Sequence, residues 1–236
     1  MKLALAVTLL LLLATSVLAG PEFEIANKIF DFGTVSQNSH VVHYFWFKST
    51  GDDTVKIERI VTGCHCTLAD YDHDVLPPGD SMLVGISWDL DRRIGFTSQY
   101  PRVYHNAPHS PTSMTIKALA VQAADTARPV SAKPYKAELS VAEPIVVDSV
   151  MIKLHNYLDH LLTVTQISRD VAWCYVDLPD TIPANGDAWI KVKVKPEYAE
   201  EDFVASVTFS MAKVKSSSDK DKPTIMTIPI RRKHYN

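Results

Sequence analysis

Apolar and polar residues alternate along much of this chain, and a period of two residues predicts β-strands. The clearest case is HVVHYFWFKSTGDDTVKI, residues 40–57, which predicts two strands joined by a Gly-Asp-Asp turn. One face of the first strand is expected to be buried, and it carries Val41, His43, Phe45 and Phe47. The opposite face carries Val42, Tyr44, Trp46 and Lys48. This stretch therefore predicts a strand that is apolar on both sides.

Further short strands follow at roughly ten-residue intervals. After the turn signal Pro77-Pro78-Gly79-Asp80, one face of a predicted strand is apolar, at Met82, Val84, Ile86 and Trp88, and Leu, Gly and Ser stand between these residues. Another strand pair is expected from Gly95, and one more strand in SMTIKALAV, residues 113–121. Little of the chain has helical periodicity. The pattern predicts an all-β fold of the immunoglobulin-like β-sandwich type.

The second half of the chain repeats the pattern of the first. Three landmark pairs share one offset of 107 positions, and they are Phe47 with Leu154, Ile60 with Ile167, and Gly79 with Gly186. A single offset over three landmarks indicates one module used twice. It also favours a strand at 161–167, where the leucine spacing alone would fit a helix.

The repeat predicts two tandem immunoglobulin-like β-sandwich domains behind a leader. Residues 1–19 have one lysine, an apolar run and small residues before Gly20, which is typical of a cleaved signal peptide. We expect a first domain at 20–124, a linker at 125–134 within the Ala- and Pro-rich stretch AADTARPVSAKP (residues 123–134), and a second domain at 135–236. The mature chain is then expected to be exported, periplasmic or extracellular, with no transmembrane segment.

Charge narrows the classes of function. The formal net charge is −3, which is too weak a bias to attract nucleic acid or an anionic membrane. No nucleophile elbow, phosphate loop, HExxH motif or dinucleotide-binding fingerprint occurs, so we expect a non-enzymatic protein. No cofactor is expected, with copper or zinc as the alternative.

Several motifs resemble one bacterial family of exported proteins. They are, in order, Phe30-Asp31-Phe32-Gly33, His43 to Gly51, Cys64-His65-Cys66-Thr67, Pro77-Pro78-Gly79 and Tyr104-His105-Asn106. This order is similar to the domain-of-unknown-function family numbered fifteen-seventy-three, over roughly residues 30–121. The resemblance implies an immunoglobulin-like fold similar to Hydin-type modules, export, and a Gram-negative envelope. It implies no catalytic residue.

The cysteine motif allows three interpretations. An extended backbone would place Cys64 and Cys66 on one face, with Cα atoms about 6.6 Å apart, so a disulfide needs a bend. The family has glycine where this chain has His65, and histidine disfavours a tight turn there. The favoured interpretation is a core face, since the offset pairs the two cysteines with Val171 and Trp173. The alternatives are a redox-active disulfide and a soft-metal site using Cys64, His65 and Cys66.

Two other features are candidates. Cys174 aligns with Thr67 and is expected to be a buried thiol. Tyr44 and Trp46 on the outer strand face suggest a partner surface, unless the other module covers them. The sequence thus predicts an exported binding or scaffold protein of the cell envelope with a protein or glycan partner. A thiol redox or copper-binding protein using Cys64 and Cys66 is the alternative.

Overall fold

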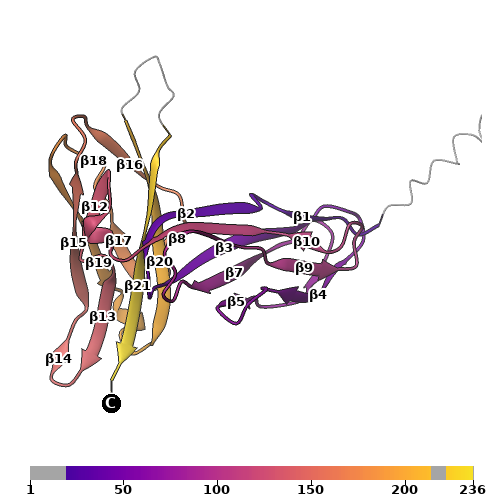
Figure 1. Cartoon of the computed structure of the whole chain (residues 1–236). Helices are drawn as coiled ribbons and strands as arrows, with labels where there is room; N and C mark the ends of the chain where they lie inside the picture. Colours follow the sequence, from indigo (N-terminus) through magenta and orange to yellow (C-terminus); the bar gives the residue numbers. More distant parts are fainter. Residues whose placement is uncertain (1–19, 214–221, 236) are drawn as a thin grey trace, which may run out of the picture.

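The computed structural model describes residues 20–213 and 222–235, and these residues form an almost entirely β protein (Figure 1). The only helical turns among them are two short 3-10 segments, η1 (Ala124–Thr126) and η2 (Pro196–Tyr198). No helix in this part of the chain is both long and apolar enough to cross a membrane. The all-β prediction is confirmed. The predicted signal peptide lies outside the described residues.

The first unit consists of strands from two facing layers. One layer is the sheet β1-β3-β7-β5, formed by β1 (Phe23–Ile25), β3 (His40–Ser49), β7 (Ser81–Asp89) and β5 (Thr67–Asp70). The other contains a sheet β10-β9-β4-β6, formed by β10 (Thr112–Ser113), β9 (Arg102–His105), β4 (Val55–Val61) and β6 (Val75–Leu76). It also contains β2 (Ile29–Ser36), β11 (Thr115–Val121) and β8 (Gly95–Gln99). Consecutive strands β3 and β4 therefore lie in different sheets.

The second unit repeats these pairings. Its sheet β12-β15-β19-β17 comprises β12 (Val130–Lys133), β15 (Ser149–Asn156), β19 (Asp187–Val194) and β17 (Cys174–Asp177). The facing strands are β18 (Thr181–Ile182), β16 (Leu162–Gln166), β20 (Phe203–Lys213), β21 (Thr224–His234), β13 (Ala137–Ala142) and β14 (Ile145–Val146). β17 lies at the 107-residue offset from β5, as the sequence repeat predicts.

The strands differ from the sequence-based prediction at two places, and each difference has a clear cause. Four residues of the predicted linker 125–134 form β12, because they pair with β15 as β1 pairs with β3. The long strand β20 corresponds to two shorter strands, β8 and β9, in the first unit, where Pro101 lies between them. The boundaries predicted for the two domains remain a prediction.

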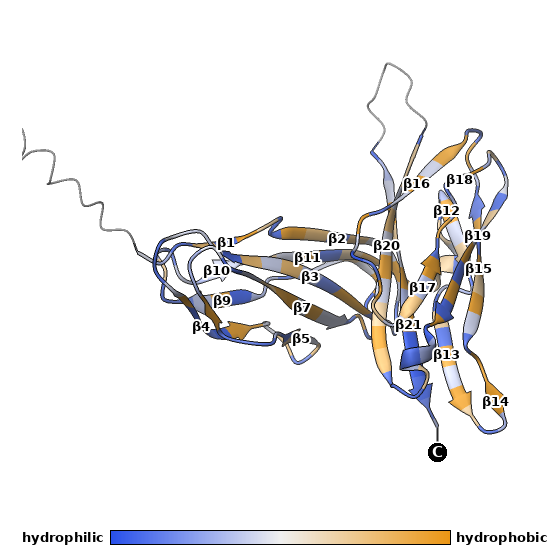
Figure 2. Cartoon of the chain, turned by 180° about the vertical axis from the view of Figure 1, so that it is seen from behind, coloured by the Kyte–Doolittle hydropathy of each residue, from blue (hydrophilic) through white to orange (hydrophobic). Residues whose placement is uncertain are grey.

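Each unit has its own cluster of buried apolar side chains. In the first unit the largest fully buried side chains include Trp88, Phe32, Phe45 and Phe47, and in the second Phe209 and Leu139. Strand β19 alternates exposed and buried residues without exception. Figure 2 shows the same alternation of hydrophilic and hydrophobic bands along strands of both units. The outer face predicted for β3 holds in part, because Trp46 and Lys48 are exposed whereas Val42 and Tyr44 are half-buried.

The two units share one sheet. A nine-stranded sheet runs from β18 to β8 and crosses between the units where β2 pairs with β21 at Thr34 and Met226. There the Thr227 hydroxyl donates a 2.6 Å hydrogen bond to the Phe32 carbonyl. Gly33, at φ +63°, lies in a bulge of β2 against the backbone of Ile225. The Phe-Asp-Phe-Gly motif therefore forms the junction between the units.

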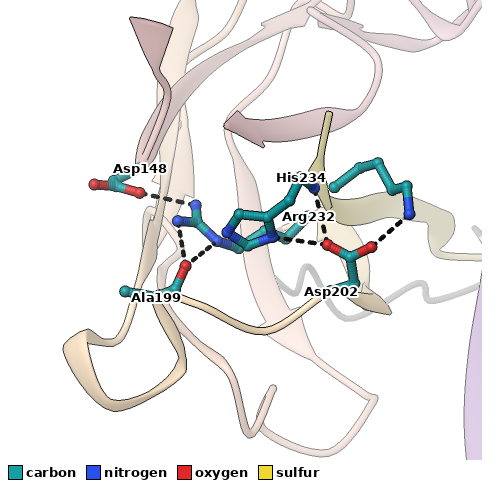
Figure 3. Close-up of polar contacts among 6 residues, drawn as sticks. Asp148, Ala199, Asp202, Arg232 and His234 are labelled. Atoms are coloured by element: carbon teal, nitrogen blue, oxygen red, sulfur yellow. Dashed lines mark hydrogen bonds and ion pairs between the residues drawn. The ribbon is translucent and has the colours of Figure 1, made fainter. Parts of the chain in front are cut away.

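A buried arginine fixes the end of β21 (Figure 3). Arg232 is 3% exposed, and its Nε and Nη2 donate to the Ala199 carbonyl at 2.8 and 2.6 Å. Its Nη1 donates to Asp148 at 2.8 Å. Beside it, Asp202 accepts hydrogen bonds from Lys233 and His234, which hold the pKa of Asp202 well below its usual range.

Candidate functional site

The Gly63–Thr67 stretch forms a turn closed by a disulfide. Cys64 and Cys66 are bonded, with Cα atoms 5.2 Å apart, closer than in an extended strand. The Thr67 amide donates to the Cys64 carbonyl at 3.3 Å, which closes the turn. Positive φ occurs at Gly63 (+84°) and not at His65, so the steric objection to histidine does not apply. The favoured core interpretation is thus wrong for Cys64, which is half-buried and does not pack against the core cluster, and holds only in part for Cys66, which borders the core.

Polar groups lie close to both sulfurs. The Thr67 hydroxyl is 3.4 Å from Cys64 Sγ and 3.8 Å from Cys66 Sγ. Arg93 Nη2 donates to Cys66 Sγ at 3.5 Å, and its Nη1 donates to the Asp89 carbonyl at 3.4 Å. Across residues 20–213 and 222–235, no group of three or more His, Cys, Asp or Glu side chains is placed to hold a metal ion. His65 is exposed.

The same turn in the second unit contains no disulfide. The counterpart of Cys64 is Val171, which is buried, and the counterpart of Cys66 is Trp173, whose ring stacks on Phe203 at 5.6 Å. Cys174 is a free, buried thiol, as predicted, and burial raises its pKa to about 12. It therefore stays protonated at neutral pH.

The two aromatic residues predicted as a partner surface lie at the junction between the units. Trp46 is 42% exposed, and Tyr44 is half-buried. Arg169 from the second unit lies 5.7 Å from the centre of the Tyr44 ring and 6.0 Å from that of Trp46. These distances allow a cation–π contact with either ring. The expectation that the other module covers these rings is met only for Tyr44.

A cavity of about 230 Å³ opens beside Tyr44, between β3 and the segment 168–173. We call Tyr44, Trp46, Arg169 and this cavity the junction groove. Gly85 lies opposite Tyr44 on β7, and a Cβ there would be 3.0 Å from Tyr44 Cε1, so glycine leaves room for the ring. Burial raises the pKa of Tyr44, and nearby Asp70 raises it further. The phenol is therefore a hydrogen-bond donor at neutral pH.

Two groups that line the cavity are already engaged by the fold. The Ser206 hydroxyl accepts from the Val42 amide at 3.0 Å and donates to the Val42 carbonyl at 2.9 Å. The ring of His43 stacks on Phe30 with centroids 3.5 Å apart. Burial lowers the pKa of His43 to about 3, so the ring is neutral.

Sequence reasoning missed Arg169, Ser206 and Gly85. Arg169 and Ser206 lie more than 100 positions from β3, and no spacing in the sequence links them to it. Gly85 could have been found, because strand glycines often mark a close approach of another group. The register of β3 and β7 is what identifies Tyr44 as that group.

Solved structures similar to this chain share little sequence with it. A protein of unknown function from Porphyromonas gingivalis W83 is 12% identical, with a TM-score of 0.36, over 89% of this chain and 98% of that one. The ASH / PapD-like domain 7 of human CEP192 is 16% identical, with a TM-score of 0.37, over 43% and 86%. The secreted serine protease VesC from Vibrio cholerae is 13% identical, with a TM-score of 0.35, over 92% and 52%. None of these similarities transfers an activity or a partner.

A sequence-family comparison bears on the first unit. No curated protein matches the chain. The family resemblance drawn from the motifs is confirmed, with a match that includes the Phe-Asp-Phe-Gly motif, the cysteine turn and Pro77-Pro78-Gly79. Residues 23–120 match the family described as "Protein of unknown function (DUF1573)".

Proposed function

We propose that this chain is an exported, non-enzymatic binding protein of the bacterial cell envelope that holds a protein or glycan partner at the junction groove. The observation that carries the proposal is the placement of Tyr44, Trp46 and Arg169 together, from two units, beside an open cavity. Aromatic residues and arginine are enriched where proteins bind partners. A large apolar ring that remains exposed on a strand is a further indication of such a surface.

The chemistry of the groove suits binding. Tyr44 offers a hydroxyl donor, and Trp46 offers a broad apolar face. Asp70, near Tyr44, and Asp170, which lines the cavity, add acceptors. A partner that presents apolar surface and hydrogen-bonding groups together, as sugars and peptides do, can satisfy both. The engagement of Ser206 and His43 by the fold also supports binding over catalysis.

Partner capture tests this proposal. The double variant Tyr44→Ala/Trp46→Ala, with the leader removed, is compared with the unaltered chain as bait in envelope extracts. The matched control is Tyr175→Ala/Trp189→Ala, which removes two aromatic residues of the second unit that are 57% and 53% exposed. We expect the groove variant to lose a partner that the control retains. Equal capture by all three baits would contradict the proposal.

Thiol redox or soft-metal chemistry at Cys64 and Cys66 is a second candidate function. The bonded state of the two sulfurs favours the redox form. Copper or zinc would need both sulfurs as thiolates, so a metal could bind only after reduction. The two candidate functions use different residues and are compatible.

A further inference from the structure

We propose that Cys64 and Cys66 form a thiol–disulfide exchange site, in which Cys64 is the sulfur attacked by a partner thiolate and Cys66 is the leaving thiolate, held by Arg93. The inference rests on the second candidate function and is independent of the junction groove. Four observations support it. The fold does not require the disulfide, the disulfide is accessible, its two sulfurs have different neighbours, and the equivalent turn of the second unit lacks the two cysteines and the arginine.

The fold does not require this disulfide. The second unit forms the equivalent turn with Val171 and Trp173, and the following strand, β17, begins at the same relative position as β5. A bond between residues two positions apart also restricts the unfolded chain little, because the entropic effect grows with the length of the closed loop. Because this disulfide contributes little to the stability of the fold, it can take part in thiol–disulfide exchange.

The bond is accessible to another molecule. Both cysteines are half-buried, so part of each side chain is in contact with solvent, and His65 between them is exposed. Two apolar side chains close to this site in the sequence are exposed. Leu68, two positions after Cys66, is 66% exposed, and Ile94, which follows Arg93, is 69% exposed. These apolar side chains can contact the segment that carries an incoming thiol. Cys174, in contrast, is buried and cannot take part.

The two sulfurs have different surroundings. Within residues 20–213 and 222–235, only Cys66 Sγ has a cation at hydrogen-bonding distance, the guanidinium of Arg93. That side chain is held by the Asp89 carbonyl, while the Asp89 amide donates to the Cys66 carbonyl at 2.7 Å. A nearby cation stabilises a thiolate, and the more stable thiolate leaves faster. The geometry thus directs attack to Cys64. In the second unit, the offset places Glu200 where Arg93 stands.

The exchange balances with a dithiol protein as the reductant. Its first thiolate attacks Cys64 Sγ, a new S–S bond forms, and the electron pair of the Cys64–Cys66 bond goes to Cys66. Thr67 can donate its hydroxyl hydrogen bond to that thiolate. The second partner thiolate then attacks the partner's own sulfur and releases Cys64. The partner is oxidised by two electrons, and the two protons from its thiols go to Cys64 and Cys66. The reverse sequence oxidises a dithiol pair on this chain.

The test uses the chain without its leader and glutathione as the probe thiol. After incubation in glutathione buffers, acid quench and alkylation, intact and peptide masses report the state of each cysteine. We expect the bond to equilibrate with glutathione in the folded protein, with glutathione on Cys64 in the mixed disulfide. In Cys66→Ala, oxidised glutathione should trap a stable adduct on Cys64. A folded bond that resists millimolar glutathione, or an adduct found mainly on Cys66, would overturn the proposal.

The role of Arg93 has its own control. In Arg93→Ala we expect the rate of reduction by glutathione to fall by roughly three- to tenfold, and the pKa of the reduced Cys66, measured by ultraviolet thiolate absorbance, to rise. Arg92→Ala removes an exposed neighbouring arginine and should change neither. Identical rates in Arg93→Ala and Arg92→Ala would exclude the assigned role. Tyr44→Ala/Trp46→Ala should exchange normally, so failure of the groove proposal is distinguishable from failure of this one.

Discussion

Replacing Gly33 with alanine should weaken the junction between the units more than an equivalent change elsewhere. At φ +63°, a residue with a Cβ is strained by about 1–2 kcal/mol. The new Cβ would also lie 2.6 Å from Ile225 Cβ and closer still to the Ile225 carbonyl oxygen. Strands β2 and β21 must therefore move apart, which weakens or breaks the hydrogen bond from Thr227 to the Phe32 carbonyl. Leaving a buried group without its partner costs about 1–3 kcal/mol.

The lower entropy of an unfolded chain with alanine offsets about 0.4–1 kcal/mol of this cost. Gly33→Ala should thus lower the free energy of unfolding by about 2–4 kcal/mol. Gly79→Ala is the matched control, because Gly79 also has positive φ, +81°, yet a Cβ there meets nothing within 4 Å. Its cost should be about 1 kcal/mol, which is strain less the same entropy gain.

Urea unfolding of both variants, followed by circular dichroism, measures the difference. If Gly33→Ala and Gly79→Ala lose the same free energy, the contact with Ile225 does not constrain β2, and the assignment of the Phe-Asp-Phe-Gly motif to the junction fails. A change in the slope of the transition for Gly33→Ala alone would show instead that the two units had begun to unfold separately.

Three further predictions follow from buried groups. His43 has a folded pKa of about 3 against 6.5 for the free side chain, so below about pH 6.5 only the unfolded state binds the proton. Stability should fall by about 2 kcal/mol between neutral pH and about pH 5, and His43→Phe should remove that part of the loss in acid titrations of unfolding. Arg232→Met should cost about 2–4 kcal/mol in urea unfolding by leaving the Ala199 carbonyl unpaired, whereas Arg231→Met, at an exposed position, should cost little; equal losses would exclude this role. Cys174, with a pKa raised to about 12, should react with iodoacetamide only after unfolding, and labelling of the folded protein would show that the site opens.

The fold could be predicted largely because two signals agreed. Alternation in residues 40–48 identified the buried face of β3. The offset of 107 predicted a strand at 161–167, where leucine spacing alone would fit a helix, and β16 lies at 162–166. The predicted linker 125–134 includes an edge strand, because its Ala, Pro and Ser content is typical of a linker. Only the pairing of Val130–Lys133 with β15 identifies that strand, and such pairing is not encoded locally.

The candidate sites were less predictable. The aromatic pair was visible on the sequence, since Tyr44 and Trp46 share the outer face of one strand. Arg169 was not visible, because it reaches the rings only through the packing of two units. The disulfide was not the favoured prediction, because an extended backbone was assumed at residues 64–66 and a tight turn was expected to be unfavourable at His65. The bend depends instead on Gly63, one position before the first cysteine, where positive φ costs nothing.

The shared sheet has a consequence for the kinetics of recognition. Because β2 and β21 are joined by backbone pairing and side-chain hydrogen bonds, the rings on one unit and the guanidinium on the other are already in place before a partner arrives. Under the proposed binding function, association would therefore need no hinge closure, and its rate should be set by diffusion and orientation. The entropy lost on binding is largely that of the partner, so a stiff partner segment should bind more tightly than a flexible one with the same contacts.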